Sequence, residues 1–225
     1  MSVSGLSPVS QDYLKTIWTT SEWADESATV KQLAERMGVR PATASDAVKR
    51  LAAQDLVVHE PYGSIELTEA GRAHAVAMVR RHRLIETFLV EMLGYGWDEV
   101  HDEAEILEHA ASDTMIERID AALGHPIRDP HGDPIPSADG TPHRPDAMQL
   151  SLAPADTALT VCRISDADPE TLRHMGSLGI VLDTRLMVDA HRAFAGELEL
   201  LLTDTGLRLT LGRIAADAVW VTVTA

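Results

Sequence analysis

Cysteine is almost absent from this 225-residue chain, which contains a single one, Cys162. One cysteine excludes an internal disulfide and every zinc module built mainly from cysteine. Long apolar runs are missing as well, and none approaches the roughly 18 residues that a membrane span needs. The first residues also lack a basic stretch followed by an apolar core, which is the pattern of a secretory signal. We therefore expect a cytoplasmic protein without a membrane segment.

Basic residues are scarce, with 19 Lys and Arg against 35 Asp and Glu, and the formal net charge is −16. This balance argues against nucleic-acid binding by the chain as a whole. Residues 28–58 are the exception, because five basic side chains stand there against three acidic ones. Any contact with nucleic acid is therefore expected in this window.

A helix-turn-helix pattern occupies the locally basic window. Thr29 suits the N-cap of a helix whose apolar residues recur at helical spacing until Gly38 stops it. A second helix is expected from Pro41 to Gln54. The residues predicted to face DNA are Arg40, Ala42, Thr43, Ser45, Asp46, Lys49 and Arg50.

Two β-rich segments, LVVHE and SIELT, follow the second helix and are joined by a turn at residues 61–63. They indicate a hairpin, the wing of a winged helix. Short helix pairs are common in proteins that do not bind DNA. The wing directly after the pair favours a DNA-binding winged helix over an ordinary helical module.

The second region, from Thr68 to about Leu123, is expected to hold two long helices with apolar faces. One runs through AGRAHAVAMVRRHRLIETFLVEML to Gly94, and the other begins near Asp98 and continues through MIERIDAAL. Apolar faces of this length need a partner surface, so we expect a homodimer. A stretch rich in turn formers, GHPIRDPHGDPIPSADGTPHRPDAM, then leads to a β-rich end.

Five strands are expected after residue 150, in TALTVCRI, GIVLDTRLMVD, ELELLLT, GLRLTLG and AVWVTVT. They suggest a small barrel of SH3-like size. The predicted fold class is therefore mainly α with a small β part.

Histidine and glutamate gather at two places in the helical region. In RRHRLIETF, His82 and Glu86 stand one helical turn apart. In VHDEAEILEH, four such side chains share an arc of roughly 100° on one helix face. These four are His101, Glu105, Glu108 and His109. Either group alone is most often solvated surface, but together they supply the several nitrogen and oxygen donors that a divalent ion needs.

The order and spacing of these motifs resemble the diphtheria-toxin-repressor family of metal-dependent transcriptional repressors. The matching stretches are QDYLKTIW, LAERMGVRPATASDAVKRL, RHRLIE, VHDEAEILEHAASD and PHGDPIP, which cover nearly the whole chain. The resemblance implies a winged helix-turn-helix DNA-binding domain (1–67) and a helical metal-binding and dimerisation domain (68–124). It further implies a linker (125–149) and an SH3-like, FeoA-like barrel (150–225).

The resemblance also implies two metal sites. One would use His82, Glu86 and His101, with Asp168 as an oxygen ligand from the third domain and Glu170 or Thr171 as alternatives to Asp168. The other would use Asp12, Glu105, Glu108 and His109. An ion there would tie the first helix to the dimer core, and without it the acids are expected to repel one another.

Asp12 and Glu105 stand where iron-sensing members of that family carry methionine and cysteine. Carboxylates suit Mn²⁺, whereas sulfur donors suit softer ions, so Mn²⁺ is the predicted cofactor and Fe²⁺ the alternative. The predicted function is a Mn²⁺-activated homodimeric repressor that binds a palindromic operator and controls metal-uptake genes. Two alternatives remain: a metal-dependent hydrolase, although no H-E-x-x-H or nucleophile motif is present, and a winged-helix regulator that needs no metal.

Overall fold

The structure is a computed structural model that describes residues 5–23, 27–59, 63–137, 140–141, 144–192 and 194–224. Contacts within the chain divide it into two compact units. The first combines residues 1–85, 105–127 and 135–142, and the second combines residues 86–104, 128–134 and 143–225.

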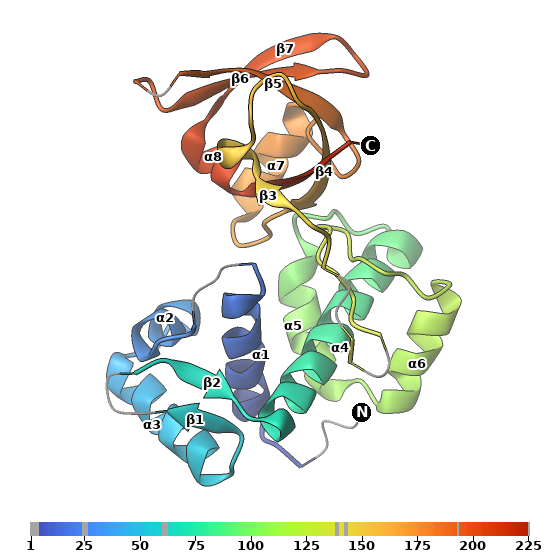
Figure 1. Ribbon diagram of the computed structural model, residues 1–225. Helices are drawn as coiled ribbons and strands as arrows, with labels where there is room; N and C mark the ends of the chain where they lie inside the picture. The colour runs from blue at the N-terminus through green and yellow to red at the C-terminus, as the bar shows by residue number, and fades with distance from the viewer. Residues whose placement is uncertain are drawn as a thin grey trace. The chain divides into compact units, whose positions relative to one another are not determined.

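The first unit begins with three helices packed around a two-stranded antiparallel hairpin (Figure 1). The elements are α1 (Pro8–Glu22), α2 (Val30–Arg36), α3 (Pro41–Ala53), β1 (Val57–His59) and β2 (Ile65–Leu67). Leu14, Leu33 and Val48 are fully buried in their common core. Both helices of the helix-turn-helix and both strands of the wing are confirmed. The turn of the wing, at residues 60–62, lies outside the described residues.

Local signals set the turn between α2 and α3. The Thr29 hydroxyl accepts a hydrogen bond from the Gln32 amide at 3.3 Å, and the Gln32 side chain accepts one from the Thr29 amide at 2.9 Å. This reciprocal pair satisfies two amides that a helix start leaves free. Gly38 follows α2 with φ +62°, a conformation that costs glycine little, and Pro41 opens α3.

The helical region differs from the prediction at one point. The helix α4 (Glu69–Leu93) is continuous, but the second predicted helix is broken into α5 (Val100–Ala110) and α6 (Asp113–Ala122). At the break, Ser112 caps α6 by accepting a hydrogen bond from the Met115 amide at 3.2 Å. Arg81 donates to the carbonyl of Ala111 and pairs with Asp113. The break is therefore stabilised by a serine cap and by a cation at the end of α5.

The second unit contains a six-stranded antiparallel sheet with the order β3-β8-β4-β5-β6-β7 (Figure 1). Its strands are β3 (Met148–Gln149), β4 (Ala158–Ile164), β5 (Arg185–Arg192), β6 (Glu197–Leu202), β7 (Leu207–Gly212) and β8 (Val219–Val223). Two helices, α7 (Pro169–Ser177) and α8 (Arg213–Asp217), accompany it. Leu172 and Met175 of α7 are buried in the same core as Val161 and Leu200 of the strands.

The five predicted strands correspond to β4 to β8, while β3 and both helices are not among the predicted elements. The predicted barrel is not closed. Among the described residues, β3 pairs only with β8 and β7 only with β6, so the sheet keeps two edges. The start of α7 does carry a recognisable sequence signal, because Asp168 caps the helix and Pro169 is its first residue.

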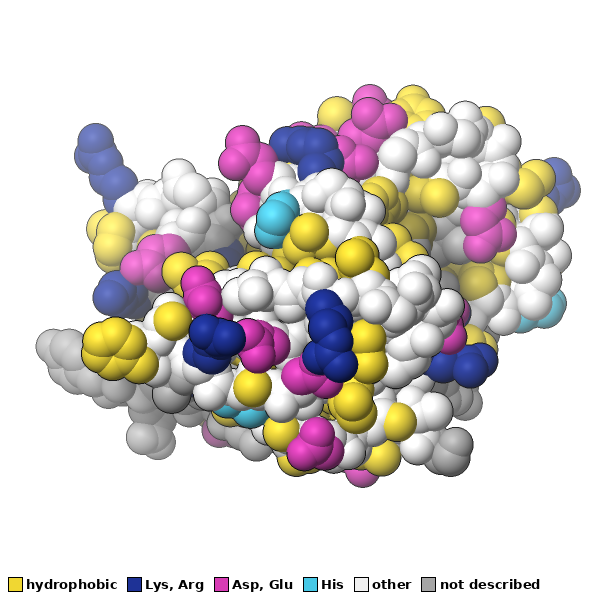
Figure 2. Space-filling model, turned by 90° about the horizontal axis from the view of Figure 1, so that it is seen from above, with side chains coloured by type: hydrophobic (Ala, Val, Ile, Leu, Met, Phe, Trp, Pro, Cys, Tyr) yellow, Lys and Arg dark blue, Asp and Glu magenta, His cyan; other side chains and the backbone are white. Residues whose placement is uncertain are grey.

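Charges of opposite sign are mixed on the surface. On the face drawn in Figure 2, Lys and Arg side chains stand beside Asp and Glu. In the sheet, Arg192 pairs with Glu199 and Arg208 with Asp189. Within the described residues, every helix is too short or too polar to pass through a bilayer.

Candidate metal centres

Acidic and histidine side chains meet in four groups of three, in each of which the candidate ligand atoms lie within 4.8 Å of one another. The groups are Asp12–Glu108–His109, His82–Glu105–Glu108, His82–Glu86–His101 and Glu86–His131–Asp166. Such mixed nitrogen and oxygen donors suit first-row divalent ions. All the predicted metal ligands except Asp168 fall into these groups, and their role as ligands stays a prediction.

The α1 cluster, formed by Asp12 of α1 with Glu105, Glu108 and His109 of α5, is the first centre. Oδ1 of Asp12 lies 2.9 Å from Nε2 of His109, which is also 3.7 Å from Oε1 of Glu108. Oδ1 of Asp12 is buried and forms no hydrogen bond within the described part of the chain. Burial raises the pKa of Asp12, and the charge of His109 opposes that rise. The ion pair with His109, without a hydrogen bond, leaves this buried acceptor only partly satisfied, and a cation at this point would complete it.

Glu108 is the most deeply buried carboxylate of the α1 cluster, with 0% of its surface exposed. Burial raises its pKa, but the hydrogen bond from His82 and the charge of Lys15 lower it more, so that the net shift is downward. Nδ1 of His82 lies 2.6 Å from its Oε2. Glu108 therefore stays ionised, the form in which a carboxylate binds a metal.

Lys15, which is not among the predicted ligands, also enters the α1 cluster. Its Nζ lies 2.7 Å from Oε1 of Glu105 and 2.6 Å from Oε1 of Glu108. Burial lowers the pKa of Lys15, but the two carboxylates raise it more, so that the pKa lies above its usual value. The sequence predicts that the acids repel one another without metal. The positive charge of Lys15 offsets the negative charges of two of them, Glu105 and Glu108.

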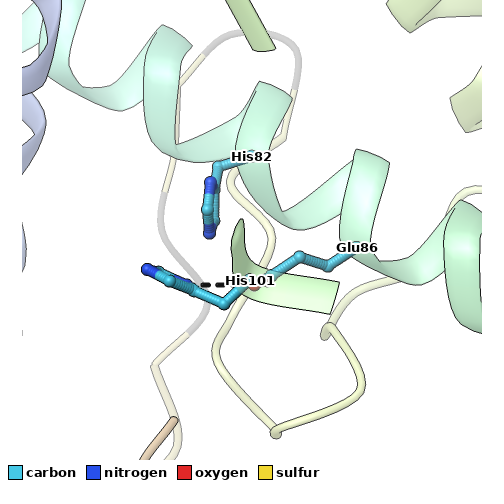
Figure 3. A group of neighbouring side chains, drawn as sticks. All are labelled: His82, Glu86 and His101. Atoms are coloured by element: carbon cyan, nitrogen blue, oxygen red, sulfur yellow. Dashed lines mark ion pairs between the residues drawn. The ribbon is translucent and has the colours of Figure 1, made fainter. Parts of the chain in front are cut away.

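The β-domain cluster, formed by Glu86, His101, His131 and Asp166, is the second centre. Figure 3 shows His82 and Glu86 on successive turns of α4 and the ion pair that joins Glu86 to His101. Nδ1 of His101 lies 3.4 Å from Oε1 of Glu86 and 3.3 Å from Oδ2 of Asp166. Burial raises the pKa of Asp166, but the hydrogen bond from His101 and the charge of His131 lower it more, to well below its usual value.

His131 presents a nitrogen to this cluster. Its Nε2 lies 2.6 Å from the carbonyl oxygen of Trp97, to which it donates a hydrogen bond. Its buried Nδ1, 3.9 Å from Oε2 of Glu86, has no hydrogen-bond partner among the described residues. Donation from one ring nitrogen to a carbonyl is the arrangement that orients a histidine whose other nitrogen binds a metal. The donor set therefore fits a divalent ion.

The loop that carries His131 is fastened to β4. The Ile164 amide donates a hydrogen bond to the His131 carbonyl at 2.8 Å, and the His131 amide donates to Asp129 Oδ1 at 2.9 Å. Gly132 has φ +92°, and a Cβ there would come within 2.0 Å of the Cys162 carbonyl oxygen. Only glycine allows this close approach, so the PHGDPIP motif fixes the loop against the strand.

Asp168 has a different place from the one predicted. It is exposed and caps α7, accepting hydrogen bonds from the Glu170 amide at 3.0 Å and from the Thr171 hydroxyl at 2.8 Å. Asp166, two residues earlier, is the carboxylate that faces His101. Among the described residues neither alternative, Glu170 or Thr171, belongs to a group of candidate ligands.

Binding of Mn²⁺ at the β-domain cluster is expected to strengthen as pH rises. Burial lowers the pKa of His101, but Asp166 and Glu86 raise it more, to about 10. The imidazole of His101 is therefore protonated at neutral pH. At any pH below this pKa, a metal must displace the proton in order to bind His101. Affinity should rise about tenfold per pH unit for each proton released. Calorimetric Mn²⁺ titrations between pH 6 and 8, in buffers of different ionisation enthalpy, measure the Mn²⁺ affinity and the number of protons released. Binding without proton release would contradict this prediction.

The residues predicted to face DNA lie on α3, except Arg40, which is its N-cap. Six are exposed and Ser45 is half-buried. On the opposite side of the helix, Ala44 and Val48 are fully buried. Among the charged members, Lys49 forms an ion pair with Asp46 at 3.1 Å. The exposed side of α3 thus presents cations and hydroxyls, while its apolar side is fixed in the core.

Comparison with known proteins decides the family. Residues 5–65 match the family model described as the iron dependent repressor N-terminal DNA binding domain, and residues 68–137 that of the iron dependent repressor metal binding and dimerisation domain. Residues 148–223 match the FeoA domain. The iron-dependent repressor IdeR of Mycobacterium tuberculosis is 32% identical in an alignment of 191 residues that covers 79% of this chain and 82% of the relative. The chain belongs to the iron-dependent repressor family.

The repressor is also similar to the diphtheria toxin repressor of Corynebacterium diphtheriae, with 34% identity over 157 residues that cover 69% of this chain and 64% of the relative. One similar solved structure is a manganese-dependent transcriptional repressor in complex with manganese. Its TM-score is 0.92 and its identity 55%, over 96% of this chain and 100% of that one. The manganese regulator SloR matches with a TM-score of 0.81 and 33% identity, over 97% of this chain and 100% of that one. The prediction of a metal-dependent transcriptional repressor rather than an enzyme is confirmed.

Proposed function

We propose that this repressor is activated by Mn²⁺ and then binds a palindromic operator as a homodimer in the cytoplasm, where it controls metal-uptake genes. The observation that carries the proposal is the convergence of Asp12 from α1 with Glu108 and His109 from α5. Carboxylate and imidazole donors favour Mn²⁺, whereas the single cysteine lies in β4, outside the four groups. The similarity to manganese-dependent repressors supports the same ion.

Two centres would hold the ion. In the α1 cluster the ligands would be Asp12, Glu105, Glu108 and His109, as the sequence predicted. In the β-domain cluster they would be Glu86, His101, His131 and Asp166, with Asp166 in place of Asp168. His82, one turn before Glu86 on α4, stays a predicted ligand.

The proposed mechanism is a population shift of α1. When bound, the ion supplies positive charge that satisfies the buried acids of the α1 cluster. Asp12 lies on the helix that packs beneath the DNA-binding elements, whereas Glu108 and His109 lie on α5. Holding these side chains together fixes α1 and so the position of α3. A coupling of this kind is typically worth about 1–3 kcal/mol.

Exposed apolar side chains on α5 support the homodimer. Ile106 is 70% exposed and Leu107 is 37% exposed. Contiguous exposed apolar patches are a feature of association surfaces, and these two neighbouring side chains would contribute to such a patch. A twofold dimer would place two copies of α3 in major grooves about one helical turn, or a multiple of it, apart. We also propose a functional division at residues 67, 124 and 149, which is supported by family-model matches to residues 5–65, 68–137 and 148–223.

Selection of duplexes from a random DNA pool tests the proposal. With Mn²⁺ present, we expect enrichment of palindromic sites that disappears when the metal is removed by chelation. Lys49→Ala with Arg50→Ala should weaken binding to all sequences alike and reduce its salt dependence, because these cations contact phosphates. Arg213→Ala, which removes an exposed cation of α8, is the matched control and should change nothing. Enrichment that is equal without metal would refute metal activation.

Metal choice is expected to follow the donors at residues 12 and 105. Asp12→Met combined with Glu105→Cys should move activation toward Fe²⁺ and weaken the response to Mn²⁺, because sulfur donors suit later metals. The measurement is DNA affinity across a concentration series of each metal under anaerobic conditions. Asp12→Glu with Glu105→Asp keeps oxygen donors and should preserve the order of metals. An unchanged order in the sulfur variant contradicts the prediction.

A further inference from the structure

Asp46 is the one acidic residue among the seven that are predicted to face DNA. Its side chain is 64% exposed. DNA carries a dense row of negative phosphates, so a carboxylate that approaches the double helix is repelled by its backbone. An acid on this surface therefore needs a hydrogen-bond donor on the DNA to offset the repulsion.

Helical geometry places Asp46 on the side of α3 that faces away from the core. Successive residues of a helix are turned by about 100°, so that Asp46 lies at about 40° when Ala42 is taken as zero. On the same scale the buried residues of α3 lie between about 140° and 240°. These are Ala44, Ala47, Val48 and Leu51. Asp46 is also in the first half of α3, the part of a recognition helix that contacts base edges.

The carboxylate of Asp46 keeps one oxygen available. Nζ of Lys49 lies 3.1 Å from Oδ1 of Asp46. Within the described part of the chain, Oδ2 of Asp46 accepts no hydrogen bond. The charge of Lys49 offsets part of the repulsion between this carboxylate and the phosphates. Oδ2 can therefore accept a hydrogen bond from a base.

We propose that Asp46 recognises a cytosine in the major groove of each operator half-site, where the N4 amino group of the base donates a hydrogen bond to Oδ2. This inference rests on the proposed function. An ionised carboxylate only accepts hydrogen bonds. In the major groove guanine and thymine present acceptors, and adenine presents its amino donor beside the acceptor N7. Cytosine alone presents a donor without an acceptor, so it is the base that a carboxylate selects.

Glu35 on α2 provides a matched control. It is exposed and forms an ion pair with Lys31, whose Nζ lies 3.9 Å from its Oε1. In a helix-turn-helix the first helix crosses the DNA backbone, whereas the second enters the groove. Glu35 thus has the same charge and the same kind of partner as Asp46, but it has no access to base edges.

Selection from a random DNA pool with Mn²⁺ present tests the inference. The unmutated repressor should enrich cytosine at one equivalent position in both half-sites. Asp46→Ala should accept any base there and keep the other preferences. Asp46→Asn should select adenine instead, because an amide pairs with both N6 and N7 of that base. Glu35→Ala should retain the cytosine.

Methylation of the selected cytosine at N4 tests the same contact without changing the protein. The methyl group replaces the hydrogen that faces the major groove, while base pairing is kept. Fluorescence anisotropy with Mn²⁺ should show affinity of the unmutated repressor falling by about 5–150-fold, the usual cost of one mismatched base pair. The affinity of Asp46→Ala should not fall.

The outcomes separate this inference from the proposed function. Metal-dependent DNA binding without an enriched cytosine overturns the inference alone. So does a cytosine preference that survives in Asp46→Ala, or an equal effect of methylation on both proteins. Absence of Mn²⁺-dependent DNA binding by the unmutated repressor overturns the proposed function itself and this inference with it.

Discussion

Asp12→Ala should produce a folded dimer whose DNA affinity no longer responds to Mn²⁺. The side chain is the only carboxylate that α1 contributes to the α1 cluster, so its loss removes the connection from this helix to Glu108 and His109. Coupling between metal and DNA of about 1–3 kcal/mol corresponds to about 5–150-fold in affinity, and we expect most of it to disappear. Fluorescence anisotropy with a selected operator, at a series of Mn²⁺ concentrations, measures the response.

The control for Asp12 is Asp102→Ala, which removes an exposed carboxylate of α5 outside the four groups. It should leave the Mn²⁺ response intact. Coupling also has a reciprocal consequence, because operator DNA must tighten Mn²⁺ binding by the same factor as Mn²⁺ tightens DNA binding. Calorimetry that gives the same Mn²⁺ affinity with and without operator would falsify the coupling, whichever ligands hold the ion.

Asp166→Ala is expected to lower Mn²⁺ affinity at the β-domain cluster by about 100-fold or more. The change removes an oxygen donor, and even a partner that only orients a metal ligand is worth about 10–100-fold. It also takes away the carboxylate that lies 3.3 Å from Nδ1 of His101. Titration with Mn²⁺ in the Asp12→Ala background isolates this centre from the α1 cluster.

Asp168→Ala is the matched comparison, since it removes the same side chain two residues away. There the lost interactions are the cap hydrogen bonds at the start of α7. A lost N-cap typically costs about 1 kcal/mol of stability, so the melting temperature should fall slightly while Mn²⁺ binding stays unchanged. A loss of affinity in Asp168→Ala and not in Asp166→Ala would restore the ligand that the sequence suggested.

Elements with local signals are predictable from sequence. Thr29, Gly38 and Pro41 delimit the helices of the helix-turn-helix, and each acts through its own backbone or a neighbour three residues away. The break after α5 is not predictable in this way, because it depends partly on Arg81, about 30 residues earlier in the chain. The predicted closure of the sheet is wrong, since strand pattern specifies the alternation of side chains but not the pairing of distant edges.

The candidate centres also combine features that local sequence predicts with features that depend on distant contacts. Helical spacing alone places Glu105, Glu108 and His109 together, because a helix converts sequence separation directly into geometry. The ion pairs of Lys15 with Glu105 and Glu108 depend on packing between α1 and α5, and the place of Asp166 depends on the course of the chain after β4, so helical spacing predicts neither. His131 lies in the PHGDPIP motif, but nothing in that motif indicates that its Nδ1 is buried beside Glu86.

The attachment of residues 128–134 to β4 sets where this protein can be cut and rejoined. A graft of the sheet that begins after residue 142 would leave His131 behind with the donor protein, without the Ile164 amide that positions it. A graft that begins at Arg128 would carry His131 and Asp166 together as one cassette. Metal preference at this centre should then travel with the cassette into a chimaera, because half of its proposed protein ligands would move as a preassembled piece.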